Sequence, residues 1–529
     1  MSASTLIPAA SGPAAAEART GGRAALRSAL APGPSYWLVC AALFGVPVAF
    51  YCASPLGYEW AARDIWHHVA VLRELMAAPF DPANPHVPTE EGSRYFTPTA
   101  LVAALIGRVL TDDPVAVLGW VGAANCAALC VGARSVARRL YAHPYAPHVL
   151  LCTLLLLWGA QDGFTGQYSL AAFAFAASYP AAQGFVFGLF LWALVLSQLS
   201  GGGDRRPAVP LRAVCGTAAL TALLVLTHQL TGAIMLAGAG SFVLFRGEAS
   251  VRYRACLVAA LGGGVLSTLL WPYFDPWTVT SSVSDERWRS TVGVMNTVGY
   301  QFGLAWPALI LGPIGLLHAK GTRASLLLPI MVMSVGWAAM TMADHPIAAR
   351  LSAAAMLYLH LASVFALLAA QRGELRVPGR FVILAFAVGL MLVSAVRVTA
   401  TRANEYVFRN GQDGLLRVAR EASLIVPEDA VAFATEHAVY PYQSTGRRVV
   451  SIPRPEPAAP SLPARQRATI RFFAPQTTAE ERDALLAEWD AGYVVIRTFD
   501  LPPEVVRDIA ALGTATRLDH DLLVVAVTE

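Results

Sequence analysis

The sequence predicts a polytopic α-helical membrane protein that ends in a small soluble α/β domain. Of its 529 residues, 56% are hydrophobic and only 14% are charged, whereas soluble domains are usually about a quarter charged. The mean hydropathy is +0.51. The apolar residues gather in runs long enough to cross a bilayer, and these runs stop before residue 398. The fold class therefore follows from composition and from where the apolar runs lie.

About eleven apolar runs have the roughly 17–25 residues that a transmembrane helix needs. They cover residues 36–56, 114–133, 147–161, 181–199, 212–228, 230–246, 255–272, 303–319, 324–342, 350–370 and 380–397. Before them, residues 1–33 are rich in Ala, Pro, Gly and Ser, which predicts a disordered cytosolic tail. A helix over 97–110 would reach only about 21 Å, so we expect it to lie at the membrane interface without spanning.

The distribution of basic residues predicts the orientation, because cytosolic loops collect Lys and Arg. If 97–110 does not span, the clusters at 134–139, 205–212, 246–254, 320–323 and 372–380 all face the cytosol. We then expect a multi-pass protein of the plasma (inner) membrane with a cytosolic N-terminus. A transmembrane domain would cover 34–397, its first outer loop 57–113, and an extracytoplasmic domain 398–529.

The C-terminal segment changes from apolar runs to an α/β pattern. Short β-rich runs at 431–435, 448–452, 493–498 and 522–527 alternate with helical ones. Thr478 and Glu481 have the spacing of a capping box, in which a Thr side chain and a Glu three residues later satisfy each other's backbone N–H groups. These features predict a small soluble domain.

The first outer loop carries the most promising chemistry. Its stretch from Gly57 to Pro98 holds six carboxylates and three histidines. On a helix, Asp64, His67 and His68 fall at positions i, i+3 and i+4 and point to one side. This set fits a general base with its partners, a metal site or a solvated polar face, and the residues alone leave the three open. Glu90-Glu91 is interpreted as a solvated turn.

Further candidate residues lie at the predicted outer ends of other spans. Asp162 follows the third span, where acids are costly and usually functional. His228 lies in a tight turn between two spans, where a core histidine and a substrate contact are equally consistent. The remaining candidates are basic residues that snorkel or bind an anion: Arg287, Arg289, His345 and Arg350.

Several classes of protein find no support in the sequence. It has no P-loop, no dinucleotide fingerprint after a strand, no HExxH and no GxSxG motif. Nucleotide chemistry on the cytosolic face is therefore not expected, and neither is a nucleic-acid partner. A lipid or saccharide transporter (flippase) and a non-catalytic polysaccharide-assembly partner remain as alternatives to an enzyme.

The order of these features resembles the GT-C superfamily of membrane glycosyltransferases. The features are an outer first loop with an acid near its start, an amphipathic helix, the Pro-flanked return Tyr95-Phe96-Thr97-Pro98, a basic turn at Arg134–Tyr141 and a second acid after the third span. The resemblance covers the eleven spans and the C-terminal domain. One departure is that Asp64 follows Arg63, whereas the family often pairs two acids in this loop.

The resemblance implies transfer of a sugar, usually with inversion, from a polyprenyl-phosphate donor. The acceptor would be a glycan, lipid or protein on the outer face of the membrane, as in cell-envelope and cell-wall biogenesis. Asp64 matches the catalytic acid of the first loop and Asp162 the acid of the second. A divalent ion such as Mg²⁺ or Mn²⁺, if one is required, would bind these two residues. Segments 64–68 and 79–85 also look like those of a bacterial subset that includes arabinofuranosyl transferases.

Overall fold

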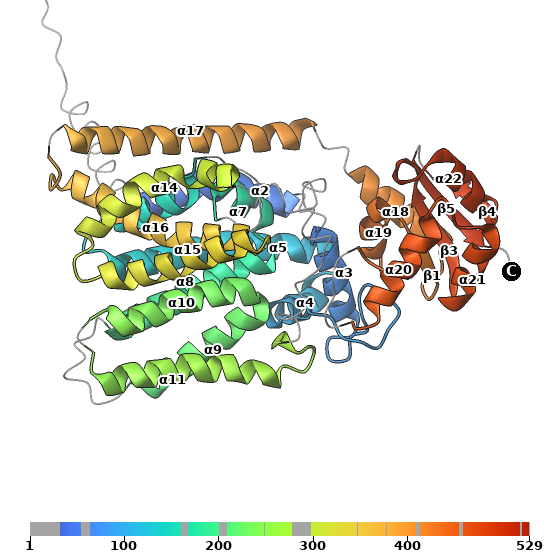
Figure 1. Ribbon diagram of the computed structural model, residues 1–529, viewed down its shortest axis with the longest axis horizontal. Coiled ribbons are helices and arrows are strands. Elements are labelled where there is room, and N and C mark those ends of the chain that lie inside the picture. Colours follow the sequence, from blue (N-terminus) through green and yellow to red (C-terminus); the bar gives the residue numbers. More distant parts are fainter. Residues whose placement is uncertain are drawn as a thin grey trace, which may run out of the picture.

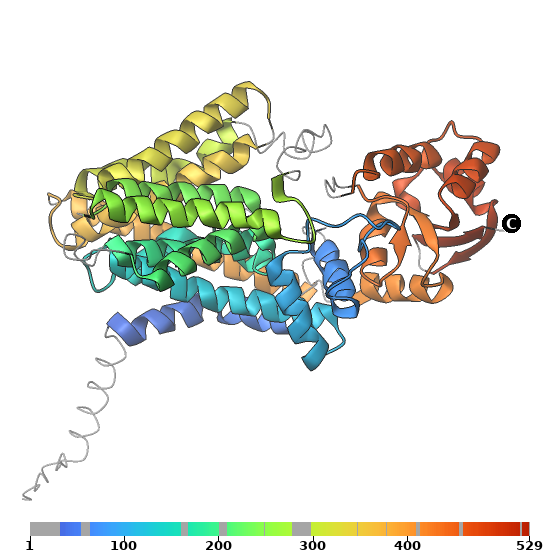
Figure 2. The same ribbon diagram turned by 90° about the horizontal axis from the view of Figure 1, so that it is seen from below.

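The protein consists of a bundle of apolar helices and a smaller sheet domain beyond one end of the bundle (Figure 1). The computed structural model describes residues 32–53, 64–159, 168–199, 209–247, 249–277, 298–345, 347–376, 378–408, 413–453, 459–518 and 521–527. Helices α3 and α4 lie between the two parts in both Figure 1 and Figure 2. We call the end of the bundle that faces the sheet domain the domain end.

Each of the eleven predicted spans contains a helix. These helices are α2 (Pro32–Ala53), α5 (Pro114–Leu140), α6 (Ala146–Leu156), α8 (Pro180–Leu199), α9 (Leu211–Thr227), α10 (Gln229–Phe245), α11 (Val251–Ser267), α14 (Val298–His318), α15 (Arg323–Met342), α16 (Ala348–Gln371) and α17 (Gly379–Phe408). By length and composition, eight helices of the described residues can cross a membrane. The apolar helices α6, α9 and α10 are shorter, with 11, 17 and 17 residues.

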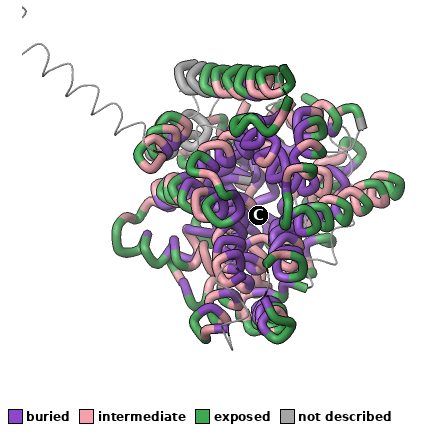
Figure 3. Tube along the Cα trace, turned by 90° about the vertical axis from the view of Figure 1, so that its left-hand side faces the viewer, coloured by how far each residue is buried: buried purple, intermediate pink, exposed green. Residues whose placement is uncertain are grey.

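Helix α16 forms the centre of the bundle and is buried along almost its whole length. Seen along the bundle, buried residues gather in the middle and exposed ones on the outer sides (Figure 3). Helix α14 approaches α16 closely because Gly312 and Gly315 face it. A Cβ at Gly312 would lie 2.7 Å from a methyl carbon of Leu359, and one at Gly315 would overlap the carbonyl oxygen of Ala362. Small residues at helix contacts are the usual means of close packing in membranes.

Two short helices cover the domain end, α3 (Asp64–Ala77) and α4 (Pro98–Leu110). Helix α4 begins with Pro98 after the N-cap Thr97, whose side chain accepts a hydrogen bond from the Ala100 N–H. Its small residues Ala103, Ala104 and Gly107 are buried, while Val109 and Leu110 are 82% and 66% exposed. This helix has 13 residues and one apolar exposed face, and its interfacial position stays a prediction.

The C-terminal part is the predicted α/β domain. A five-stranded sheet has the order β2-β1-β3-β5-β4, in which β1 runs parallel to β2 and β3 while β5 is antiparallel to β3 and β4. The strands are β1 (Val431–Ala434), β2 (Arg448–Val449), β3 (Ala491–Arg497), β4 (Gly513–Arg517) and β5 (Leu522–Val527). The helices are α18 (Asp413–Ile425), α19 (Glu436–Gln443), α20 (Leu462–Phe473), α21 (Ala479–Glu488) and α22 (Pro503–Ala510). The capping box of Thr478 and Glu481 is confirmed.

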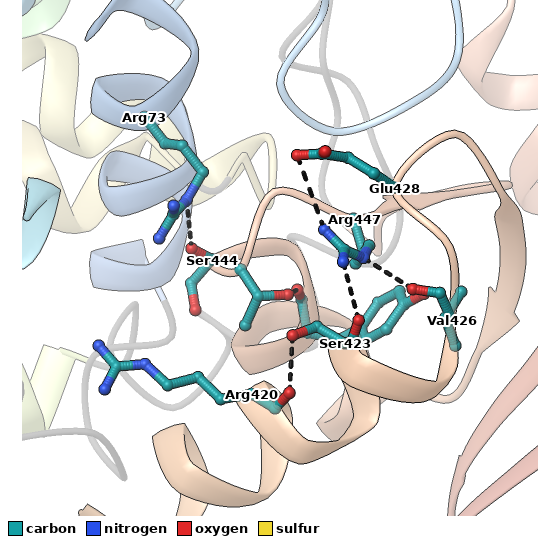
Figure 4. A network of polar contacts seen from close by, with 9 residues as sticks. Arg73, Arg420, Ser423, Val426, Glu428, Ser444 and Arg447 are labelled. Carbon is teal, nitrogen blue, oxygen red and sulfur yellow. Dashed lines mark hydrogen bonds and ion pairs between the residues drawn. The ribbon is translucent and has the colours of Figure 1, made fainter. Parts of the chain in front are cut away.

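Hydrogen bonds join the sheet domain to the first loop. The Arg73 Nε of α3 donates to the Ser444 carbonyl at 3.0 Å, next to Arg447, which in turn donates to the carbonyls of Ser423 and Val426 (Figure 4). An apolar core shared by α3, α4 and the sheet domain continues this contact. The domain therefore packs directly on the loop that carries the candidate site.

A second contact corrects the interpretation of Glu90-Glu91 as a solvated turn. The Glu91 carboxylate accepts from the Ser461 hydroxyl at 2.7 Å and from the Ser461 N–H at 3.2 Å. Ser461 comes directly before α20. Glu90 is exposed, so the solvated interpretation holds for that residue alone. The sequence could not show this because the partner lies 370 positions away.

Candidate functional site

Several predicted site residues lie outside the part of the chain that the structure describes. These are Asp162, Arg287 and Arg289. Asp64 is the first residue of α3, and only its backbone is among the described atoms. Its proposed role, and the question of which histidine faces it, therefore remain predictions.

His67 and His68 are buried, with exposed fractions of 1% and 9%. The ring of His67 makes edge contacts with His86 at 4.7 Å and with Tyr440 of the sheet domain at 4.8 Å between centroids. His68 points toward Tyr95 at 5.5 Å and toward Tyr179 at 5.2 Å. The solvated polar face, one of the three alternatives for this helix, is therefore wrong for both histidines.

Arg94 is a residue that the sequence interpretation missed. One of its terminal nitrogens donates to the Tyr95 hydroxyl at 2.9 Å, and its guanidinium carbon lies 4.9 Å from the centre of the same ring. The Tyr95 ring stacks on His67 and meets His68 edge-on. Arg94 is thereby held beside the histidines by an aromatic ring. The only signal in the sequence was an arginine directly before the Pro-flanked aromatic pair.

Arg350, at the start of α16, belongs to the same group of residues. The charges of Arg350 and Arg94 both act on the ring of His228, and so does His68. Arg350 also acts on Tyr168, whose side chain hydrogen-bonds Thr231. Residues from α3, the first loop, the α9–α10 turn and α16 thus lie near one another. The binding roles expected for His67, His68, His228 and Arg350 stay predictions.

His228 is positioned by the helix that follows it. Its Nδ1 accepts a hydrogen bond from the Thr231 N–H at 3.2 Å, so the ring caps the N-terminus of α10. Gly184 of α8 faces this turn, and a Cβ there would lie 3.4 Å from the side chains of His228 and Thr231, at ordinary contact distance. Thr99 of α4 donates to Gln183 of α8 at 2.7 Å. The first loop is therefore tied to the bundle at this point.

The cluster contains two permanent positive charges, those of Arg94 and Arg350. Besides two arginines, it contains the N-terminal ends of α8, α10 and α16, where backbone N–H groups carry partial positive charge. Such helix ends and arginines bind phosphate and carboxylate groups. We call Arg94, Arg350, His68 and His228 the cationic cluster after its two arginines, and its chemistry suits an anion at the edge of the apolar bundle.

His86 is completely buried beside this cluster, and burial with the nearby His68 and Arg94 lowers its pKa to about 3. The imidazole is therefore neutral at physiological pH. Its backbone carbonyl accepts from the Gln443 side chain at 2.9 Å and from the Val449 N–H at 3.3 Å. His86 thus links the cluster to the sheet domain.

Two predicted roles, substrate binding by His345 and metal binding, have no supporting contact in the described part of the chain. His345 Nδ1 accepts from the Ile347 N–H at 3.2 Å, which orders the turn before α16, and no described contact joins it to the cationic cluster. No group of three or more His, Cys, Asp or Glu side chains among the described residues could hold a metal ion. The predicted metal ligands Asp64 and Asp162 are not part of that set of side chains.

No protein-family model matches the chain, and no curated protein matches its sequence. Its fold is similar to that of solved structures of two proteins. An Archaeoglobus fulgidus oligosaccharyltransferase tethered with an acceptor peptide is 12% identical with a TM-score of 0.48, over 82% of this chain and 65% of that chain. ArnT from Cupriavidus metallidurans bound to undecaprenyl phosphate is 12% identical with a TM-score of 0.45, over 93% and 98%. The chain thus spans less than two thirds of the oligosaccharyltransferase.

Proposed function

We propose that this protein is a membrane glycosyltransferase that moves a sugar from a polyprenyl-phosphate donor to an acceptor outside the cytosol. The observation that carries the proposal is the cationic cluster at the end of an apolar helical bundle. A lipid-linked sugar has an apolar tail, which requires a membrane-embedded partner, and an anionic phosphate, which requires cations. The bundle and the cluster supply both at one place.

The arginines would stabilise the leaving group. As the bond between the anomeric carbon and the phosphate oxygen breaks, negative charge grows on the polyprenyl phosphate. Arg350 and Arg94 carry permanent charge near the ring of His228, and fixed cations aimed at developing charge lower the barrier. Arg287 and Arg289, from the outer loop before α14, are further candidates for the same phosphate.

Asp64 would act as the general base. It would take the proton from an acceptor hydroxyl, whose oxygen then attacks the anomeric carbon on the face opposite the phosphate, so a single displacement inverts the configuration. His67 and His68, one turn along α3, would orient the acceptor or the base. If a divalent ion is required, Asp64 and Asp162 would hold it, and that ion would neutralise phosphate charge.

The finer assignment concerns the sugar. Arabinofuranosyl transfer to a cell-surface glycan is the first donor chemistry to test, because segments 64–68 and 79–85 carry that part of the resemblance. The acceptor would be a glycan, lipid or protein of the cell envelope. In this proposal the sheet domain closes the acceptor side, since Tyr440 contacts His67 directly.

The test is transfer by the full-length protein in lipid nanodiscs, with a panel of polyprenyl-phosphate sugars that includes the arabinofuranosyl form. Asp64→Asn is expected to abolish transfer, while Asp81→Asn, an exposed acid of the same loop, is expected to retain it. Full transfer by Asp64→Asn would exclude Asp64 as the base. Movement of the lipid between leaflets without sugar transfer would favour the transporter alternative.

A further inference from the structure

The sheet domain contains a cavity of its own, away from the cationic cluster. Its volume is about 200 Å³, and it lies between α20 and the ends of β1 and β2. Sites that enclose drug-sized ligands are larger, roughly 300–1,000 Å³. The cavity therefore suits one ring of a ligand.

The topology of the sheet puts the cavity where α/β domains bind ligands. After β1 the chain turns to β2 on one side, whereas after β3 it crosses to β4 on the far side. The carboxyl ends of the parallel strands β1 and β3 therefore form a switch point, at which open α/β sheets hold their ligands. Thr435 and Glu436 follow β1, and Asp500 follows β3, and all three line the cavity.

The polar lining is dominated by hydrogen-bond acceptors. The carboxylate of Asp500 is held by His437, whose N–H donates to it at 3.1 Å and whose Nδ1 lies 2.5 Å from it. Glu436 adds a second carboxylate. Ionised carboxylates only accept hydrogen bonds, so a ligand with several hydroxyl donors complements them.

The opposite wall carries an amide, hydroxyls and an aromatic ring. Gln466 donates to the Ile452 carbonyl at 2.8 Å, which fixes its orientation on α20. Thr469 accepts from the Ser451 hydroxyl at 2.8 Å and keeps its own proton to donate. Phe473, one turn further along α20, gives an apolar surface. A few placed polar groups beside an apolar wall are typical of small-molecule sites.

The charge of the lining separates this cavity from the cationic cluster. Among the described residues that line it there is no Arg, Lys or His. The nearby Arg497 is buried and paired with Asp521 at 2.6 Å. A phosphate would meet two carboxylates, and the imidazole of His437 beside them is already engaged by Asp500, so the lining disfavours phosphorylated ligands.

From this chemistry we infer that the cavity at the switch point of the sheet domain binds a single uncharged sugar ring of a glycan. The binding itself does not depend on the proposed transfer reaction. The identification of that glycan as the acceptor, bound at a distance from the reacting hydroxyl, does rest on the proposed function.

The experiment is capture of the detergent-solubilised full-length protein on a glycan array that displays neutral, amino and phosphorylated sugars. Neutral glycans are expected to be captured. Gln466→Ala and Thr469→Val are expected to weaken capture by roughly tenfold each, the effect of losing one or two buried hydrogen bonds. Asp483→Asn, an exposed acid of α21 outside the cavity, is expected to leave capture unchanged.

Four results would overturn the inference: no capture, capture of amino or phosphorylated sugars alone, unchanged capture by both cavity variants, or loss of capture on chelation of divalent ions. Retained folding of each variant is checked by its melting temperature. Capture that persists while no sugar is transferred would leave this site standing and reject the proposed function. Sugar transfer without glycan capture would reject this site and leave the proposed function standing.

Discussion

Arg350 and Arg94 are 256 positions apart in the sequence, yet both act on one histidine ring. Neither residue type is rare, and an arginine at the end of a span snorkels as often as it binds. The convergence of two guanidinium groups with helix N-termini indicates a binding role, because such groups bind phosphate and carboxylate.

Arg350→Gln is therefore expected to reduce transfer from a polyprenyl-phosphate sugar by roughly 10²–10³-fold, the usual cost of removing one group that stabilises a leaving anion. The measurement is initial rate in nanodiscs at saturating acceptor. Lys320→Gln supplies the control, because Lys320 is exposed in the α14–α15 turn at the opposite end of the bundle. Equal rates for both variants would contradict the assignment of the phosphate to the cationic cluster.

His86 gives a prediction about pH. Its pKa in the folded protein is about 3, below the value of about 6.5 for an unfolded histidine. Between these values the unfolded state binds one more proton than the folded state. Folded stability should therefore decline as the pH falls below about 6.5, by up to roughly 1.4 kcal/mol per pH unit for this residue.

The check compares melting temperatures of wild type and His86→Phe from pH 8 to pH 4. The two curves are expected to run parallel above about pH 6.5 and to diverge in slope below it, where the wild type loses stability more steeply than the variant. His318→Gln, at the far end of the bundle, should follow the wild type. If the melting temperature of His86→Phe falls with pH as steeply as that of the wild type, burial of this ring does not cause the loss of stability in acid.

At the scale of single residues, the sequence predicted some of the residues in and around the cationic cluster. His67, His68, His228 and Arg350 were singled out, because polar groups beside apolar runs are conspicuous. Arg94 and His86 were not, because their partners come from distant elements and a loop residue shows no periodicity. The burial of His67 was also unpredictable, since Tyr440, which covers it, lies in another domain.

The elements of the bundle were easier to predict than those of the sheet domain. A long apolar run has one structural outcome in a membrane, because every backbone polar group must be satisfied within the helix. Strand β4 was missed, since Gly513–Arg517 has a mostly exposed burial pattern and no apolar alternation. The strand predicted over 448–452 is shorter, with β2 ending at Val449.

Contact between α14 and α16 supports a prediction about helix packing. Gly315→Ala is expected to lower the melting temperature, because the new methyl group would overlap the Ala362 backbone, which cannot move away as a side chain can. Overpacking of this kind costs about 1–3 kcal/mol or more. Loss of transfer should accompany it, since α16 carries Arg350.

Gly389→Ala on α17 is the matched control, as a Cβ there meets nothing within 4 Å. It should stabilise slightly, by about 0.5–1 kcal/mol, because glycine lowers helix stability relative to alanine. Similar melting temperatures for the two alanine variants would mean that the α14–α16 contact is looser than described.

In the whole molecule, the sheet domain is fixed to the bundle through the first loop. Glu91→Gln is expected to loosen this junction by about 1–2 kcal/mol, because the hydrogen bonds from Ser461 to a charged acceptor become bonds to a neutral one. The readout is hydrogen exchange of segment 79–97, which should become faster. Glu90→Gln, its exposed neighbour, should not change it. Equal hydrogen-exchange protection of segment 79–97 in the two variants would show that the contact between Glu91 and Ser461 does not hold the junction.

The general arrangement of the two parts was predictable, whereas their contact was not. Apolar density marks the bundle and its loss marks the domain. Nothing in the local sequence of Glu91 distinguishes it from Glu90, and only the position of Ser461 does. The candidate site could not be predicted in full for the same reason, because its walls belong to both the bundle and the sheet domain.

The junction also has a consequence for how the protein is made. The ribosome produces Glu91 about 370 residues before Ser461, which at 5–20 residues per second amounts to roughly 20–70 s. During that interval the first loop is already delivered to its side of the membrane while Gln443, Tyr440 and Ser461 do not yet exist. His67 of α3 lacks its contact with Tyr440 until the last domain arrives. Completion of the site is thus one of the final events of biosynthesis, and a chain interrupted before the sheet domain would hold its spans without an assembled site.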